Sequence, residues 1–308
     1  MYNEAIWLFA KGQNERTIIL PDTSHENGAP ISLSALNVYP IKSCAGISLD
    51  RAELGPRGIM HDRSFMLVDR KGKFITQRDQ PYMALIRPVI NPDGTLTVQA
   101  PGMPDLTIPG DPDGPRYEVT VWKYTGIAVD QGDDLAAWFS MLLEYPCRLV
   151  MFPNDVIRKV SPKYARREQD QVGFADGYPC LLISEASLTD LNTRLVQPLP
   201  MNRFRPNIVV RGTVPYAEDM WRTIRIGEVT FDIVKPCARC VITTTDQNTA
   251  ERGKDPLKTL ATYRLATTNG VMFGQNLIHA QTGLLRVGDP VDIIKSTDTP
   301  NFKLKQKL

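Results

Sequence analysis

Short apolar or alternating runs dominate the first half of the chain and predict strands rather than helices. The clearest of these runs are residues 31–39, 63–69, 95–99 and 117–122. Residues 73–77 follow the second run after Arg70-Lys71-Gly72, a pattern that predicts a hairpin. No long helical period interrupts these strands, so residues 31–125 are expected to form an antiparallel barrel or sandwich.

The second half of the chain mixes strand and helix periods. Further strands are expected at residues 180–184, 207–211, 223–226, 229–234, 241–245 and 284–294, the last broken at 287–290. Good capping residues predict the starts of three short helices at Asp133-Asp134, Ser184 and Asp255-Pro256.

Because strands outnumber helices, the predicted fold class is mostly β with some α, an α+β protein. We expect an N-terminal β-barrel-like domain at 31–150 and a second β-barrel domain with peripheral helices at 151–296. Residues 1–30 are polar after one short apolar run and are expected to form a loosely held leader, and 297–308 a tail.

Composition narrows the class of protein. The chain has 308 residues, 42% of them hydrophobic and 23% charged, which is typical of a globular chain of one large or two ordinary domains. The formal net charge of +2 gives no basis for nucleic-acid binding, so any cationic site must be a local cluster. The apolar run at 5–10 is too short to span a bilayer, and we expect a cytoplasmic protein with no membrane partner.

The five cysteines favour free thiols in a reducing compartment, because their number is odd and no secretory signal is seen. Cys147 and Cys180 lie in apolar runs and are expected to be buried and inert. Cys237 and Cys240 form a C-x-x-C with three competing interpretations. A zinc site lacks further ligands nearby, a thioredoxin-type dithiol lacks a following helix, and a single thiolate could bind a metal. Taken alone, two buried structural thiols are the simplest interpretation.

Cations stand at the ends of several predicted strands. Lys42 and Ser43 share one turn, Arg63 opens a strand, and Arg205 precedes another. Such a set suits a phosphorylated cofactor, because a guanidinium can hold phosphate with two hydrogen bonds. The basic stretch 153–170 is interpreted first as a solvated linker and second as a mobile lid over an anionic ligand.

Six ordered motifs make the combination recognisable: YPIKSC, HDRSFMLVD, FADGYPCLLISEASL, NRFRPNIVV, KPCARC and VMFGQN. Together they resemble the MOSC family, the molybdenum-cofactor-sulfurase C-terminal-domain proteins. The resemblance runs from about residue 34 to 294 and is strongest to the branch with amidoxime-reducing components. It implies an N-terminal MOSC β-barrel domain followed by the MOSC domain.

The resemblance also implies a molybdopterin-type molybdenum cofactor between the two parts. Cys240 would be the protein ligand of molybdenum, and Asp176 a catalytic acidic residue near it. Cys237 matches a position that is not a ligand. The residues expected around the pterin and phosphate are Lys42, Ser43, Arg63, Arg205, Asn207 and, where some relatives have tyrosine, Asn276.

The implied activity is reduction of N-hydroxylated compounds such as amidoximes and hydroxylamines, by two-electron removal of oxygen at molybdenum. The sequence has no cysteine pattern for an iron–sulfur cluster, so electrons are expected from a separate ferredoxin, cytochrome b5-like protein or flavin reductase. Two alternatives use the same Cys240 thiol, namely sulfur transfer and cofactor carriage. Pyridoxal phosphate enters only at the level of the family, through a separate domain of the sulfurases that is not seen in this chain.

Overall fold

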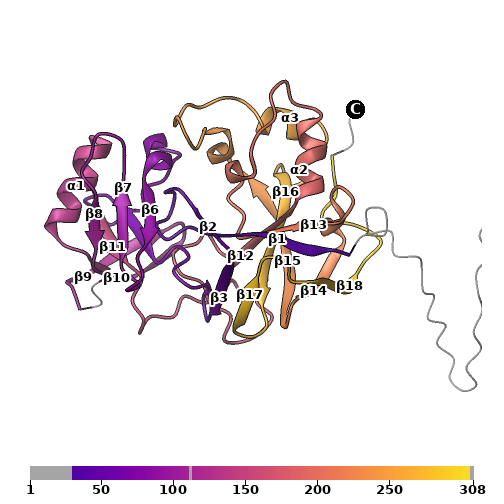
Figure 1. The fold of residues 1–308 in the computed structure, drawn as a ribbon, viewed down its shortest axis with the longest axis horizontal. Helices are drawn as coiled ribbons and strands as arrows, with labels where there is room; N and C mark the ends of the chain where they lie inside the picture. The colour runs from indigo at the N-terminus through magenta and orange to yellow at the C-terminus, as the bar shows by residue number, and fades with distance from the viewer. Residues whose placement is uncertain (1–29, 111–112, 306–308) are drawn as a thin grey trace, which may run out of the picture.

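The computed structural model describes residues 30–110 and 113–305 and shows an α+β protein made mostly of strands. Two groups of strands lie side by side (Figure 1), and the later strands form the larger group. The leader expected at 1–30 lies, apart from Pro30, outside the described residues. None of the helices in the described part of the chain is long and apolar enough to cross a membrane.

The largest sheet has eight strands and joins the start of the chain to its second half. Its order is β18 (Val291–Ser296), β14 (Trp221–Ile226), β15 (Val229–Arg239), β16 (Val271–His279), β12 (Cys180–Ser184), β13 (Ile208–Arg211), β1 (Ser32–Val38) and β2 (Ile47–Leu49). β1 runs antiparallel to β13, and β13 runs parallel to β12. A three-stranded sheet of β17 (Gly283–Arg286), β3 (Arg51–Gly55) and β4 (Gly58–Ile59) repeats this joining of early and late strands.

Two smaller sheets and a helix make up the other group. One sheet has the order β5 (Phe65–Val68), β11 (Arg148–Met151), β10 (Tyr124–Asp130) and β9 (Arg116–Val121). The second has the order β6 (Arg87–Ile90), β7 (Leu96–Gln99) and β8 (Leu106–Ile108). Helix α1 (Asp133–Leu143) packs Trp138 and Phe139 into the core between them.

The remaining helices are short. They are α2 (Glu185–Asn192), α3 (Leu257–Ala261) and the 3-10 turns η1 (Pro81–Leu85), η2 (Met201–Arg203), η3 (Ala217–Asp219) and η4 (Val241–Thr244). Ser184 caps α2 as predicted, its hydroxyl accepting from the Ser187 amide at 3.1 Å. The cap predicted for α1 is wrong: Gly132 holds the cap position, and Asp133 and Asp134 lie in the first turn.

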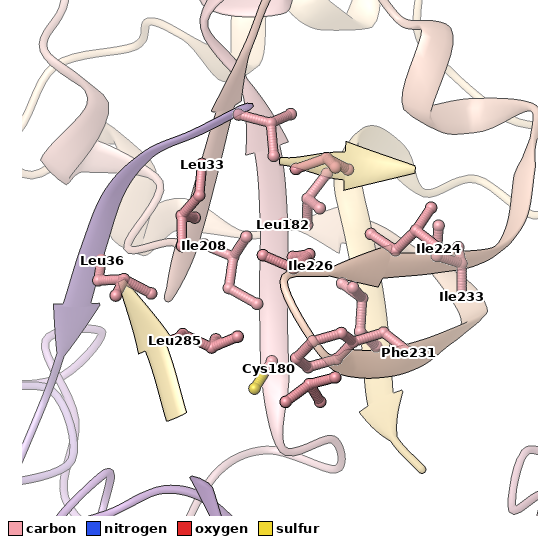
Figure 2. Packing of buried hydrophobic residues seen from close by; sticks show 14 of the residues in the cluster. Leu33, Leu36, Cys180, Leu182, Ile208, Ile224, Ile226, Phe231, Ile233 and Leu285 are labelled. Carbon is pink, nitrogen blue, oxygen red and sulfur yellow. The ribbon is translucent and has the colours of Figure 1, made fainter. Parts of the chain in front are cut away.

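Apolar side chains from early and late strands share one core beneath the large sheet. Leu33 and Leu36 of β1 meet Leu182, Ile208 and strands β14 to β17 there (Figure 2). Cys180 is part of this core, and burial raises the pKa of its thiol to about 12, as expected for an inert thiol. Cys147 is likewise buried, in the α1 core, and burial raises its pKa to about 11.

Three sequence predictions of local structure are wrong for identifiable reasons. Residues 73–77 form only single bridges, because Phe74 donates to Thr120 of β9 instead of continuing a ladder with β5. Residues 241–245 form η4 rather than a strand, because the hydroxyls of Thr243 and Thr244 bond back to carbonyls three residues earlier. In the expected tail, residues 303–305 hydrogen-bond to residues 265–267.

Gly274 gives a test of how closely β16 approaches β12. Its φ is +82°, and an added Cβ would lie 2.8 Å from the Leu182 carbonyl oxygen and 2.6 Å from Ile183 Cγ1. Gly94 has a similar φ of +85° but open space around it. We therefore expect Gly274→Ala to lower the free energy of unfolding by about 2–4 kcal/mol, and Gly94→Ala by about 1 kcal/mol. Urea denaturation of both variants measures the difference, and equal losses would contradict the close approach.

Candidate functional site

A cavity of about 1050 Å³ lies between the two groups of strands. Its walls come from the loop after β1, the start of β5 and the β9–β10 turn on one side, and from the ends of β15 and η4 on the other. The cavity brings together all eight residues singled out from the sequence: Lys42, Ser43, Arg63, Asp176, Arg205, Asn207, Cys240 and Asn276. Their individual roles stay predictions.

Lys42 and Asp176 form an ion pair at the wall of this cavity. The buried Lys42 ammonium donates to Asp176 Oδ1 at 2.5 Å and to the Phe174 carbonyl at 2.8 Å. Burial lowers the pKa of Lys42, although the Asp176 charge opposes this. Burial alone would raise the pKa of Asp176, but Lys42 and hydrogen bonding from Trp122 hold it well below its usual range. Asp176 is therefore a carboxylate at neutral pH.

Arg78 and Trp122, which the sequence analysis missed, complete the surroundings of Asp176. Trp122 Nε1 donates to Asp176 Oδ1 at 3.0 Å, and Arg78 Nη2 lies 3.8 Å from Oδ2. The same Nη2 atom donates to Cys240 Sγ at 3.4 Å, so one guanidinium links the carboxylate to the thiol. The Arg78 guanidinium lies over the Trp122 ring, 4.6 Å from its centroid.

The sequence contained one usable signal for these two residues. Trp122 occupies the two-residue turn between β9 and β10 with a φ of +57°. Glycine or asparagine normally stands at such a position, so a bulky aromatic residue there is an outlier that points to function. Arg78 carried no such signal, because it follows a segment without periodicity and reaches the site only through the fold.

A second group of side chains surrounds Asp62, which lies behind the cavity wall. Asp62 accepts from the Tyr39 amide, from both Arg63 and the Asn207 amide nitrogen, and from no solvent-facing group at its buried side. Asn207 Oδ1 accepts from Arg63 at 3.1 Å and from the Leu181 amide at 3.3 Å. The amide group of Asn207 is thus engaged within the protein and orients Arg63.

Three of the predicted site residues have positive φ angles. The values are +68° for Ser43, +45° for Arg63 and +56° for Arg205. Each costs about 1–3 kcal/mol and persists only where surrounding contacts enforce it. Here Tyr39 supplies such contacts, because Arg63 and Arg205 each lie 4.3 Å from the centroid of its ring. Strained backbone of this kind is found preferentially at ligand sites.

The C-x-x-C lies at the end of β15. Cys237 accepts from Arg239 Nη1 at 2.9 Å within the strand, and Cys240 ends the strand and begins η4. Both sulfurs are partly exposed and line the cavity, so neither is a buried structural thiol. Asn276 is held beside this loop, since its Nδ2 donates to the Lys235 carbonyl at 3.2 Å.

The cavity is strongly cationic. Its lining contains one acidic residue, Asp176, and nine basic residues: Lys42, Arg63, Arg78, Lys123, Arg158, Lys159, Arg205, Lys235 and Arg239. Burial lowers the pKa of Arg205 to about 10, which measures how unfavourable its charge is without a partner. Within the described residues, buried Arg205 Nη2 and Arg239 Nε have no hydrogen-bond partner. Unpaired buried donors are costly, so this lining fits a phosphorylated, acceptor-rich cofactor.

The basic stretch 153–170 is not simply a solvated linker. Arg158 is buried and donates to the carbonyls of Gly173 at 2.8 Å and of Asp176 at 3.2 Å. Ile157, Lys159, Ser161 and Tyr164 also line the cavity, listed here with the same wall as Asp176. The stretch therefore forms part of the site wall and supports the loop that carries Asp176.

Comparison with known proteins agrees with this arrangement. Residues 31–146 match the MOSC N-terminal beta barrel domain, and residues 169–292 match the MOSC domain. Mitochondrial amidoxime-reducing component 1 of Mus musculus is 37% identical over 280 residues, covering 85% of this chain and 82% of its own length. Mitochondrial amidoxime reducing component 2 of Bos taurus is 36% identical over 84% of this chain and 82% of its own.

A larger relative shares the same region. The molybdenum cofactor sulfurase of Oryza sativa subsp. japonica is 32% identical over 80% of this chain but only 32% of its own length. Both domain matches and the extent of the two nearly full-length similarities agree with the six motifs in the sequence. The chain therefore belongs to the MOSC-domain family, in the branch that pairs an N-terminal MOSC β-barrel domain with the MOSC domain and includes the amidoxime-reducing components.

Proposed function

We propose that this protein is a molybdenum-cofactor-dependent oxidoreductase that reduces N-hydroxylated compounds such as amidoximes and hydroxylamines. One observation carries the proposal: a single cationic cavity holds unpartnered arginine donors together with Cys240 and the Lys42–Asp176 pair. The names of the similar proteins support the substrate class. We expect a small N-hydroxylated substrate and a separate electron-donor protein, such as a ferredoxin, a cytochrome b5-like protein or a flavin reductase.

The residues present would divide the binding of the cofactor among them. Arg63 and Arg205, with Ser43 and Arg239, would hold the phosphate and the pterin, and Cys240 would provide the thiolate for molybdenum. When bound, this group supplies the two electrons of the reduction. Asn207 would act one step away, because its hydrogen bonds fix the orientation of Arg63.

The protein's own residues must supply protons. Reduction of an N–OH group to N–H releases water and consumes two electrons and two protons. Asp176 is a carboxylate at neutral pH, so it accepts and orients protons rather than donating first. The Lys42 ammonium, whose pKa burial lowers, lies 2.5 Å from Asp176 Oδ1 and can donate through it to the leaving oxygen. Water protons would then recharge Lys42.

The decisive test is made on protein from a host that synthesises molybdenum cofactor. We expect about one molybdenum and one cofactor phosphate per chain, with conversion of benzamidoxime to benzamidine by reduced methyl viologen. Molybdenum without turnover of amidoximes or hydroxylamines would favour a carrier. An added sulfur atom on Cys240 after treatment with a cysteine desulfurase, again without turnover, would favour sulfur transfer.

Trp122→Phe tests the positioning of Asp176. The phenyl ring keeps a stacking surface for Arg78 but cannot donate to the carboxylate, so we expect kcat for benzamidoxime to fall about tenfold. Molybdenum content should not change. Tyr117→Phe is the control, since Tyr117 is an exposed aromatic residue of β9 that does not line the cavity. Unchanged kcat and pH profile in Trp122→Phe would show that the hydrogen bond has no positioning role.

A further inference from the structure

Lys235 is a cation in the cavity that the proposed chemistry does not use. It lies in β15, two residues before Cys237, and its side chain lines the cavity wall. In the parts of the chain the structure describes, no carboxylate pairs with its ammonium. Its contacts are aromatic: the ammonium lies 5.0 Å from the centroid of the Tyr164 ring and 5.9 Å from that of Tyr178.

The two tyrosines add hydrogen-bond donors at the same place. Their rings meet edge to face at 5.7 Å, and both line the cavity. Burial raises the pKa of Tyr178, with smaller contributions from Tyr164 and Cys237, so its phenol keeps its proton at physiological pH. Within residues 30–110 and 113–305, neither phenol oxygen has a hydrogen-bond partner. One ammonium and two phenols thus face the cavity with unused donors.

This group of three residues stands beside the reacting end of the cavity. Tyr178 follows Asp176 by two residues, and Lys235 precedes the C-x-x-C. The charge balance also leaves room for a second anion. Nine basic residues face one acidic residue in the lining, and a bound phosphate monoester removes only about two positive charges.

Two other occupants fit less well. A purely structural lysine would gain only its cation–π contacts, which leave three donors unsatisfied in a partly buried setting. An acidic protein partner would first meet the exposed Lys159 and Lys163, whereas Lys235 is only partly exposed and lies within the cavity. A small anion that enters with the substrate satisfies all of these observations.

We propose that Lys235, Tyr164 and Tyr178 form an anion subsite that binds a carboxylate carried by the N-hydroxylated substrate. The inference rests on the proposed reductase function and makes it narrower: the preferred substrates are N-hydroxylated acids. The ammonium supplies the charge, the phenols supply directed hydrogen bonds, and the N–OH group is thereby presented toward Asp176 and Cys240.

The test compares benzamidoxime with 4-carboxybenzamidoxime in the cofactor-loaded enzyme. We expect wild type to prefer the carboxylated substrate at least about tenfold in kcat/KM. Lys235→Met should remove this preference by raising KM for the carboxylated substrate, and should leave benzamidoxime unaffected. Lys235→Arg, which keeps the charge, should retain most of it. Lys163→Met is the matched control, because Lys163 lies over the same Tyr164 ring at 5.4 Å but outside the cavity lining.

Failure of the subsite and failure of the reductase function give different results. Equal kcat/KM for both substrates in wild type, or a preference that survives Lys235→Met, overturns the subsite while the function stands. If neither substrate is reduced, the function fails, and calorimetric binding of 4-carboxybenzamidine to wild type and Lys235→Met still decides the subsite. Equal affinity in those two proteins would overturn it, and weaker binding to the variant would support it.

Discussion

A Cys240→Ser variant is expected to lose its molybdenum and with it more than about a hundredfold of the benzamidoxime-reducing activity. Loss of an outer-shell partner of a metal commonly costs 10–100-fold, so loss of a ligand should cost more. The serine hydroxyl cannot replace a thiolate toward a metal that takes soft sulfur ligands. Cys240 is placed for this role because β15 ends there and its sulfur lies on the cavity wall beside Arg78.

Cys237→Ser is the matched control for this prediction. It lies in the same loop and lines the same cavity, but Arg239 Nη1 donates to its sulfur at 2.9 Å. We expect this variant to keep molybdenum and at least a third of the activity. Elemental analysis and thermal melting of both proteins provide the measurement. Equal molybdenum in wild type and Cys240→Ser would show that Cys240 is not the ligand, and reversed behaviour of the two variants would assign Cys237 instead.

The sequence predicted the strands better than it predicted how they pair. Runs such as 180–184 and 207–211 carry their own apolar pattern, and the structure confirms them as β12 and β13. It could not show that β13 lies between β12 and β1, which are far apart along the chain. That pairing brings the loop with Lys42 to the wall of the cavity.

The same limit explains which site residues were missed. Lys42, Asp176 and Cys240 stand in motifs of the MOSC family and could be selected without any geometry. Arg78 and Trp122 become part of the site only because residues 72–74 pair with β9 and so carry the following segment to the β9–β10 turn. Such a contact depends on tertiary pairing, which propensity and periodicity do not encode.

Local chemistry also overrode periodicity at the most informative loop. Val241 and the threonines after it are β-branched and predict a strand, yet two threonine hydroxyls bond to backbone carbonyls and close η4. The turn that follows Cys240 ends the strand at the sulfur, and a continued strand would have placed the thiol within a ladder. The mistaken strand and the exposed thiol therefore have one physical cause.

Asp176→Asn is expected to keep the cofactor but to lower kcat for benzamidoxime by about 10²–10⁴-fold. The amide has nearly the same shape, but it carries no charge for Lys42 and accepts a proton poorly, so transfer from the ammonium to the leaving oxygen is interrupted. The carboxylate of wild type has a pKa held below its usual range. Its charge is therefore complete above about pH 4, and the acidic limb of a rate profile between pH 5 and 8 cannot be its titration.

The sign of the stability effect follows from the same pKa. A depressed carboxyl pKa stabilises the folded protein above the unfolded value of about 3.9 and ceases to do so as the pH falls through the folded value. Asp155→Asn is the control: its side chain is 60% exposed, like that of Asp176, and it pairs with Arg116 at 2.8 Å outside the cavity. Steady-state rates from pH 5 to 9, with molybdenum content, test both variants. If Asp176→Asn stays within threefold of wild type while Asp155→Asn is unaffected, protons must reach the substrate without Asp176.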